Sequence, residues 1–240
     1  MPVSKQVYLL DAGNTQIKIA LAQEGLIQWV KCFELSQFPL HSLDSNIPMV
    51  FSSVVQEEFN NTLQSFFTTC FEVNQQQQLP FTMAYKSPET LGKDRLCNAA
   101  ALSRLAPGKP KLALDLGTCI KFDFVTAQKE YLGGSISPGL QMRAKALATF
   151  TAKLPELAIH RSTQVIGNDS KSSMEIGTYL GWQKEIEGML ATYFNVYPDL
   201  QVFITGGDAK HFDMGQKNGI FVHENLTLEG ILALYLSHEL

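Results

Sequence analysis

Two short segments of this sequence place an aspartate at the end of an apolar run and a glycine two residues later. They are Asp11-Ala12-Gly13-Asn14 and Asp115-Leu116-Gly117-Thr118, and a second apolar run follows each. Glycine in a tight turn lets backbone N–H groups approach a phosphate with no Cβ in the way. Asn14, Thr15 and Thr118 would add side-chain donors. The repeat predicts a phosphate clamp made of two similar halves, with two ordinary glycine-turn hairpins as the alternative.

The two aspartates add a requirement of their own. A carboxylate repels phosphate, so Asp11 and Asp115 suit this chemistry only when a cation lies between the two negative groups. Two such hairpins facing a polyphosphate therefore predict metal-assisted phosphoryl transfer. Lys18, just past the first turn, would also reach a phosphate, unless it is simply an exposed lysine.

Three further segments contain residues suited to anions or to acid–base chemistry. Thr205-Gly206-Gly207-Asp208 ends an apolar run and is predicted either to begin a helix, whose N-terminus suits a nucleotide, or to form a plain turn. The glycines of Gly133–Gly139 permit close backbone approach, and Pro138 is predicted to start a helix. Gly92-Lys93-Asp94-Arg95 opens another predicted helix. Asp94 there either complements the helix dipole or acts as a general base beside an anion-binding guanidinium.

The composition excludes some classes of function. The chain has 240 residues, 45% of them apolar and 18% charged, with a net charge of −4. This gives no case for nucleic-acid binding, which needs clustered Lys and Arg. No apolar run approaches the roughly 20 residues that span a bilayer. The four cysteines form no CxxC pair, so we expect reduced thiols in a cytoplasmic protein.

Apolar patterning predicts alternating strands and helices, and hence an α/β architecture. The turn-rich segment 107–110 is the expected domain boundary, with halves 1–108 and 109–240. The first half would hold the phosphate motif at Asp11, and the second half would hold the phosphate motif at Asp115. Strands are expected at Val7–Leu10, Ile17–Ala22, Leu26–Phe33, Met49–Val54, Leu112–Leu114, Ile120–Val125, Tyr131–Ile136 and Gln201–Thr205. Helices are expected at Gln56–Phe67, Pro138–Phe150, Ser172–Tyr193 and Asn225–Leu236, and a loop that enters a helix is expected at Gly92–Leu105.

Taken in order, these motifs resemble those of the type III pantothenate kinases, in the acetate and sugar kinase/Hsp70/actin superfamily. The resemblance covers most of the chain. The matching segments are Asp11 to Thr15; Tyr85, Pro88, Leu91, Gly92, Asp94 and Arg95 in the pattern Y-x-x-P-x-x-L-G-x-D-R; Asp115 to Thr118; Gly133-Gly134, Ile136, Pro138 and Gly139; Ile166-Gly167, Ser170 and Met174; Gly177 and Gly181; and Thr205 to Gly207.

The resemblance implies two ribonuclease H-like α/β halves facing across a nucleotide cleft, as in actin-like ATPases. It implies ATP-dependent phosphorylation of pantothenate, the first step towards coenzyme A, by a homodimer whose substrate pocket lies near the subunit interface. Asp94 would be the general base, and Mg²⁺ would accompany ATP, held through water by Asp11. Asp115 would bind a monovalent cation, K⁺ or NH₄⁺. Pantothenate would contact Tyr85, Gly92, Lys93, Asp94, Arg95 and Ser170, and ATP would contact Asp11, Ala12, Gly13, Asn14, Thr15, Gln16, Ile17, Lys18, Thr118, Gly206 and Gly207.

The sequence departs from the family pattern at three places. Lys93 replaces a small residue, Ser170 replaces threonine, and Cys119-Ile120-Lys121 replaces a threonine-rich stretch. Lys121 could supply a positive charge where other members rely on the monovalent cation. Two alternatives stay open: another small-molecule kinase of the same fold, or a nucleotide-binding regulator that has lost catalysis.

Overall fold

A computed structural model describes residues 6–158, 160–212 and 218–237, which form two compact units. Unit 1 takes the described residues of 1–108, 123–133 and 225–240, and unit 2 takes those of 109–122 and 134–224. These units differ from the predicted halves, 1–108 and 109–240, because residues 123–133 and the C-terminal helix α5 (Leu226–Ser237) group with unit 1. The physical reason is packing: α5 lies against helix α2 (Lys93–Arg104) and strands of the first sheet.

The sheet of unit 1 has the strand order β3-β2-β1-β4-β5. β2 pairs antiparallel with both β1 and β3, whereas β4 pairs parallel with β1 and β5 pairs parallel with β4. Their bounds are β1 Gln6–Ala12, β2 Ile17–Gln23, β3 Leu26–Phe33, β4 Met49–Ser53 and β5 Cys70–Glu72.

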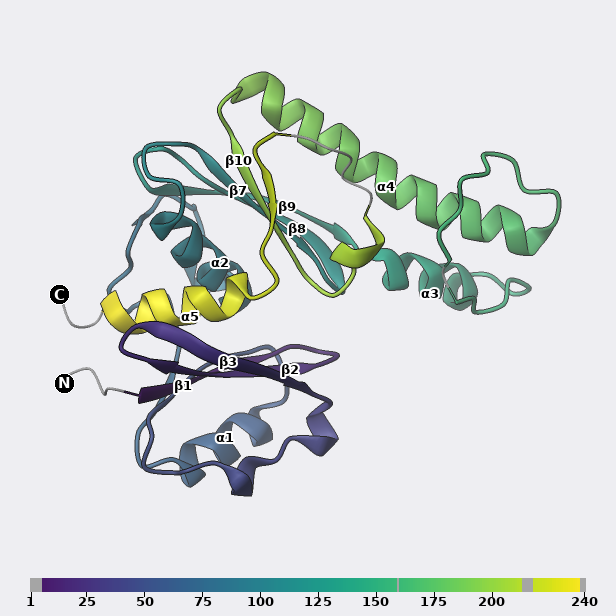
Figure 1. Ribbon diagram of the computed structural model, residues 1–240. Coiled ribbons are helices and arrows are strands. Elements are labelled where there is room, and N and C mark those ends of the chain that lie inside the picture. Colours follow the sequence, from purple (N-terminus) through teal and green to yellow (C-terminus); the bar gives the residue numbers. More distant parts are fainter. Residues whose placement is uncertain (1–5, 159, 213–217, 238–240) are drawn as a thin grey trace. The chain divides into compact units, whose positions relative to one another are not determined.

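Helices cover both faces of this sheet, which explains the continuous apolar run at the start of β1. Tyr8 and Leu10 pack into a cluster with Leu63 of α1 (Glu57–Phe66). Successive strand residues alternate between faces, so Leu9 points to the side that α5 contacts. Figure 1 shows α1 and α5 on opposite sides of β1–β3.

A second sheet, most of whose strand residues belong to unit 2, has the order β11-β10-β7-β8-β9, and the short β6 adds at its β9 edge. Reversed, this order repeats that of the first sheet, with β7, β8, β9, β10 and β11 in the places of β1 to β5. The parallel pairing of β10 with β7 and of β11 with β10 repeats it too. The bounds are β6 Thr82–Met83, β7 Lys111–Leu116, β8 Cys119–Val125, β9 Glu130–Pro138, β10 Gln201–Thr205 and β11 Ile220–Val222.

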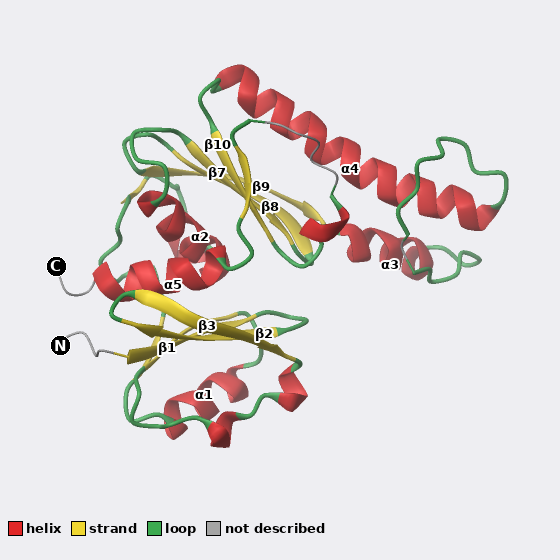
Figure 2. Ribbon diagram, in the orientation of Figure 1, coloured by secondary structure: helices red, strands yellow, loops and turns green. Residues whose placement is uncertain are grey.

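The long helix α4 (Ser170–Val196) lies beside this second sheet, and the shorter α3 (Leu140–Phe150) lies near the N-terminal part of α4 (Figure 2). Tyr193 of α4 stacks on Phe122 of β8, with ring centroids 6.0 Å apart. Trp182 is fully buried. Aromatic packing therefore fixes α4 against the sheet.

The structure corrects some of the predicted elements. The edge strands β5, β6 and β11 were not predicted, because they have only two or three residues. The helix expected after Gly207 is a single 3₁₀ turn, Ala209–His211. Pro138 ends β9 rather than starting α3, because Gly139 donates its N–H to the carbonyl oxygen of Thr118 and keeps this segment extended.

Candidate active site

The first hairpin, β1–β2 in unit 1, has a four-residue turn from Gly13 to Gln16. The Gly13 N–H donates to the carbonyl oxygen of Gln16 at 3.0 Å. The strand register pairs Asp11 directly with Lys18, so the two side chains lie on the same face. Asp11 also pairs with Ser52 of β4 in the parallel ladder. All the residues predicted to contact ATP between Asp11 and Lys18 therefore belong to one hairpin.

The second hairpin, β7–β8 in unit 2, has a shorter turn formed by Gly117 and Thr118. Two glycines from distant segments pack onto its backbone. A Cβ at Gly139 would lie 2.3 Å from the Gly117 carbonyl oxygen, and a Cβ at Gly206 would lie 2.4 Å from the carbonyl of Leu116. Gly206 also has φ +94°, a conformation that favours glycine. Only glycine fits at these two positions without moving the hairpin.

This packing brings together three of the predicted motifs in one unit: the second phosphate motif, the end of the Gly133–Gly139 segment and the late glycine pair. The Asp208 N–H donates to the carbonyl oxygen of Leu116 at 2.8 Å and ties the glycine pair to the hairpin. Burial raises the pKa of the Asp208 carboxyl, an effect that His211 and Lys210 oppose. Thr118, Gly206 and Gly207 thus belong to one group of residues.

Asp94 lies in the first turn of α2, in unit 1, where its Oδ1 accepts the N–H of Arg95 at 2.9 Å. A Cβ at Gly92 would lie 2.7 Å from the same Oδ1, so the glycine leaves room for the carboxylate. Burial raises the pKa of the nearby Cys97 thiol, and the charges of Asp11 and Asp94 raise it further. Asp94, the predicted base, and Asp11, of the first phosphate motif, therefore both lie close enough to Cys97 to affect its pKa electrostatically.

Helix α5 holds α2 in place. A Cβ at Gly230 would lie 1.8 Å from the carbonyl oxygen of Cys97, so the two helices touch backbone to backbone. The Thr227 hydroxyl donates to Oδ1 of Asn98 at 3.1 Å. The predicted C-terminal helix thus has a role that its sequence did not indicate: it fixes the helix that carries Asp94 and Arg95.

Arg95 lies in a buried network of charged and aromatic side chains. Its Nε donates to Oδ1 of Asp123 at 2.7 Å, and the Tyr131 hydroxyl donates to the same oxygen at 2.8 Å. The guanidinium lies 5.8 Å from the ring centroid of Tyr85. Gly133, with φ +101°, leaves space for Tyr85, since a Cβ there would lie 2.8 Å from the ring. Tyr85 and Arg95, both predicted to bind substrate, are therefore brought together.

Asp123 and Tyr131 are the residues that sequence reasoning missed. The available signal was an aspartate between two phenylalanines in an apolar strand, Phe122-Asp123-Phe124, where an unpaired charge would be costly. Burial raises the pKa of the Asp123 carboxyl to about 6, against the opposing effects of Arg95 and the Tyr131 hydrogen bond. Burial is the largest single influence on the pKa of Arg95 and lowers it, but Asp123, Tyr131 and Tyr85 together raise it by more, so the net shift is upward.

Lys93, Lys121 and Ser170, the other residues singled out in the sequence, lie outside the buried network around Arg95. Lys93 forms an ion pair with Glu72 of β5 in unit 1. Lys121 forms an ion pair with Asp115, with 2.8 Å between Nζ and Oδ2. Ser170 lies in unit 2 as the first residue of α4, after the N-cap Asp169, whose Oδ1 accepts the Ser172 N–H. Ser170 is thus assigned to a different unit from Tyr85 and Arg95.

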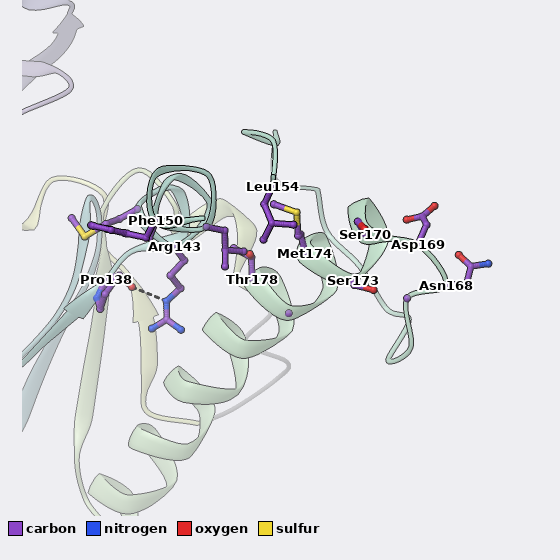
Figure 3. A pocket seen from close by; sticks show the side chains of 15 residues that line it. Pro138, Arg143, Phe150, Leu154, Asn168, Asp169, Ser170, Ser173, Met174 and Thr178 are labelled. Atoms are coloured by element: carbon purple, nitrogen blue, oxygen red, sulfur yellow. Dashed lines mark hydrogen bonds between the residues drawn. The ribbon is translucent and has the colours of Figure 1, made fainter. Parts of the chain in front are cut away.

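Ser170 lines a groove of about 1160 Å³ between α3, the following segment and the start of α4 (Figure 3). Arg143 of α3 is among the lining residues; its Nε donates to the Pro138 carbonyl oxygen at 2.9 Å, and its guanidinium forms an ion pair with Glu185. The Ser137 hydroxyl also donates to Glu185. The remainder of the lining combines apolar and small residues with four polar ones, Asn168, Asp169, Ser173 and Thr178. The apolar and small residues include Met142, Ala146, Leu147, Phe150, Leu154, Gly167, Met174 and Gly177.

The described residues contain neither a cluster of metal-ligating side chains nor a membrane-spanning helix. No group of three or more His, Cys, Asp or Glu side chains there is placed to hold a metal ion. Of the helices in this part of the chain, none has the length and apolar character needed to cross a membrane.

The two sheets with a repeated strand order define the α/β fold of the actin-like ATPases, with two ribonuclease H-like halves, as the motifs predicted. Two solved structures share this fold. One is a putative Baf family transcriptional activator from Campylobacter jejuni, with a TM-score of 0.63, 18% identity and coverage of 96% of this chain and 98% of that one. The other is the activator of 2-hydroxyisocaproyl-CoA dehydratase from Clostridium difficile with bound ADPNP, with a TM-score of 0.53, 13% identity and coverage of 98% and 95%.

Sequence comparison then identifies the family. The profile of the type III pantothenate kinases matches residues 7–192. A type III pantothenate kinase from Cytophaga hutchinsonii is 36% identical over 224 residues, covering 93% of this chain and 95% of the relative. That of Christiangramia forsetii is 35% identical over 231 residues, with the same coverage. The chain belongs to the type III pantothenate kinase family.

Proposed function

We propose that this protein transfers the γ-phosphoryl group of ATP to the terminal hydroxyl of pantothenate, the first step of coenzyme A biosynthesis. The observation that carries the proposal is the arrangement of the substrate motif in unit 1. Asp94 and Arg95 occupy the first turn of α2, and a buried network fixes Arg95 beside Tyr85. Family membership and this geometry both support a site that binds a small anionic alcohol.

Asp94 is the general base in this proposal. An alcohol is a weak nucleophile, and a positioned carboxylate helps by accepting its proton. The substrate oxygen forms a bond to the γ-phosphorus, the bond to the leaving ADP oxygen breaks, and the hydroxyl proton passes to the Asp94 carboxylate. One carboxylate oxygen accepts the Arg95 N–H, which fixes the side chain at the helix start.

Arg95 is the anchor for the substrate. Its Nη2 is buried and has no hydrogen-bond partner in the described part of the chain. A buried guanidinium N–H left unmatched is costly, so an incoming acceptor oxygen would be bound strongly. The carboxylate or the amide oxygen of pantothenate supplies such an acceptor. Tyr85 is held beside the guanidinium, and Gly92, Lys93 and Ser170 complete the proposed contacts.

The residues assigned to the nucleotide are Asp11 to Lys18 in unit 1, and Thr118, Gly206 and Gly207 in unit 2. Mg²⁺ typically takes one or two carboxylates and completes its shell with waters and phosphates. Asp11 lies at the end of β1, and no cluster of three or more metal-ligating side chains occurs in the described residues. A single carboxylate of this kind would hold Mg²⁺ through a bridging water. When bound, Mg²⁺ neutralises charge on the phosphates. Asp115 requires a positive partner too, either a monovalent cation or the Lys121 ammonium.

The test is a coupled ADP-release assay with pantothenate against a panel of hydroxylated acids and sugars. We expect turnover with pantothenate and a product that carries one phosphate on the terminal hydroxyl. Turnover with another alcohol alone would assign the protein to a different small-molecule kinase activity. ATP binding without turnover on any acceptor would favour the non-catalytic regulator.

We also propose that the protein is a homodimer and that the α3–α4 groove contributes to its interface. Phe150 at the groove is 84% exposed, and the neighbouring Val165 and Ile166 are almost as exposed. Exposed apolar side chains in or next to one groove are typical of protein–protein interfaces. We expect Phe150→Glu to shift the sedimentation coefficient to that of a monomer. Leu26→Glu, at an exposed leucine on β3 of unit 1, is the control and should remain dimeric.

A further inference from the structure

The Asp115–Lys121 ion pair lies at the base of the second hairpin. Asp115 is in β7 and Lys121 is in β8, on either side of the Gly117-Thr118 turn. The Lys121 Nζ lies 2.8 Å from Oδ2 of Asp115, and the two side chains are only 15% and 11% exposed. A charge pair this enclosed is screened by solvent much less than a surface pair.

Both oxygens of this carboxylate have defined surroundings. Oδ2 accepts the Lys121 ammonium. Oδ1 lies against the turn, where a Cβ at Gly117 would approach it to 3.2 Å. A K⁺ or NH₄⁺ ion at Asp115 would have to approach a carboxylate that a fixed ammonium already neutralises, and the two like charges would repel. The residues present do not fit a separate monovalent cation at this position.

We propose that the Lys121 ammonium supplies, as part of the chain, the single positive charge that Asp115 requires when a polyphosphate binds, so that the enzyme needs no monovalent cation. The chemical match is close, because a lysine side chain ends in a tethered alkylammonium, a compact monovalent point charge. This inference rests on the proposed kinase function, since it concerns the charge beside the bound nucleotide. It assigns to Lys121 a role in positioning ATP.

The decisive comparison uses the unmodified protein. Initial rates with ATP and pantothenate are measured in NaCl, KCl and NH₄Cl at constant ionic strength. In parallel, the Kd of Mg–ADP is measured by calorimetry in the same salts. We expect rates and Kd values that agree within about twofold among the three salts. A stimulation of fivefold or more by K⁺ or NH₄⁺, in either measurement, would overturn the inference. Absence of turnover in every salt would count against the proposed function, and the ADP titration would still decide the role of Lys121.

Two variants test the side chain itself. Lys121→Met keeps much of the volume without the charge, and we expect kcat/KM for ATP to fall on the order of 10- to 100-fold in all three salts. Lys121→Thr leaves space and an oxygen ligand. We expect it to lose activity in NaCl and to regain it in KCl, with a KM for ATP that depends on K⁺.

Lys184→Met is the matched control, because Lys184 also pairs with a carboxylate in unit 2 but is 69% exposed. It should behave as the wild type in every salt. Wild-type kcat/KM for ATP in folded Lys121→Met, checked by circular dichroism, would also overturn the inference.

Discussion

The two hairpins of this protein occupy equivalent places in two sheets of the same topology, yet their surroundings differ. The β1–β2 hairpin has a four-residue turn, and its Asp11 lies across the strands from Lys18. The β7–β8 hairpin has a two-residue turn, two glycines against its backbone and a buried Asp115 paired with Lys121. The two sheets share one topology, but the residues that pack around each hairpin differ and so give the two hairpins different chemical surroundings.

The difference extends to the units that carry the hairpins. Unit 1 places the first hairpin near Asp94 and a buried Arg95–Asp123 pair, groups suited to proton transfer and substrate binding. Unit 2 surrounds the second hairpin with backbone and glycine, which suits close approach of a phosphate. We therefore expect substitutions in unit 1 to act on chemistry and substitutions at the second hairpin to act on nucleotide affinity and stability.

The largest expected effect tests the placement of the chemistry in unit 1. Asp94→Asn keeps the shape of the side chain but removes the proton acceptor. We expect kcat to fall by about 10²- to 10⁴-fold, the usual range for loss of a general base, with the KM for ATP nearly unchanged. Steady-state kinetics of the purified variant provide the measurement.

Glu89→Gln is the control for Asp94→Asn, because Glu89 is an exposed acid a few residues upstream. It should retain wild-type kcat. If Asp94→Asn also turns over at the wild-type rate, Asp94 is not the base, and the functional contrast between the two units loses its main support.

The next effect tests how tightly the second hairpin is enclosed. Gly206→Ala would force a Cβ against the Leu116 backbone at a positive φ, and we expect the free energy of unfolding to fall by about 3 kcal/mol or more. Gly13→Ala, with its nearest contact at 3.3 Å, should cost about 1 kcal/mol or less. Gly207→Ala, whose Cβ meets nothing within 4 Å, is the adjacent control.

Urea unfolding measures these differences. The protein has two tryptophans, Trp29 in unit 1 and the buried Trp182 in unit 2. Trp29 fluorescence therefore reports on unit 1, which holds Gly13, and the fluorescence of Trp182 in a Trp29→Phe background reports on unit 2, which holds Gly206. Equal losses for Gly13→Ala and Gly206→Ala would show that the two hairpins are enclosed alike.

The smallest expected effect concerns the buried pair of unit 1. The pKa of Asp123 is about 6 in the folded chain, above the value of about 3.9 usual for an unfolded aspartate. Because the folded state holds this proton more tightly, its contribution to stability is complete below about pH 4 and is lost as the pH rises through 6. Relative to Asp123→Asn, the free energy of unfolding of the wild type should fall by roughly 2 to 3 kcal/mol over that range.

Urea titrations between pH 4.5 and 7.5 on both proteins give the difference directly. Arg95, Tyr131 and Asp94 are the ionisable groups that act on Asp123, and all three are retained in the variant. A difference that is flat with pH, or that rises with it, would mean that Asp123 is ionised throughout and that the Arg95 charge outweighs its burial.

Much of the fold and the proposed site could be predicted from the sequence alone. The strands of both sheets, except the short edge strands, were visible as apolar runs, and the repeated Asp-x-Gly segments indicated the internal repeat. The family motifs predicted Asp94, Arg95 and Tyr85 as substrate residues, which stays a prediction, and family membership is confirmed. Local patterns suffice for these features because a buried strand, a glycine turn and a helix start each require particular residue types within a few positions in the sequence.

Only the tertiary structure decided which distant residues act together. The pairing of Arg95 with Asp123 joins residues 28 positions apart, and the local sequence around neither residue predicts the other as its partner. The return of α5 to unit 1 depends on backbone contact between Gly230 and Cys97. For the hairpins, the sequence determined two aspartates that each need a positive charge. The fold decided that Asp115 obtains one from Lys121, because an ammonium on the adjacent strand reaches the carboxylate within 2.8 Å.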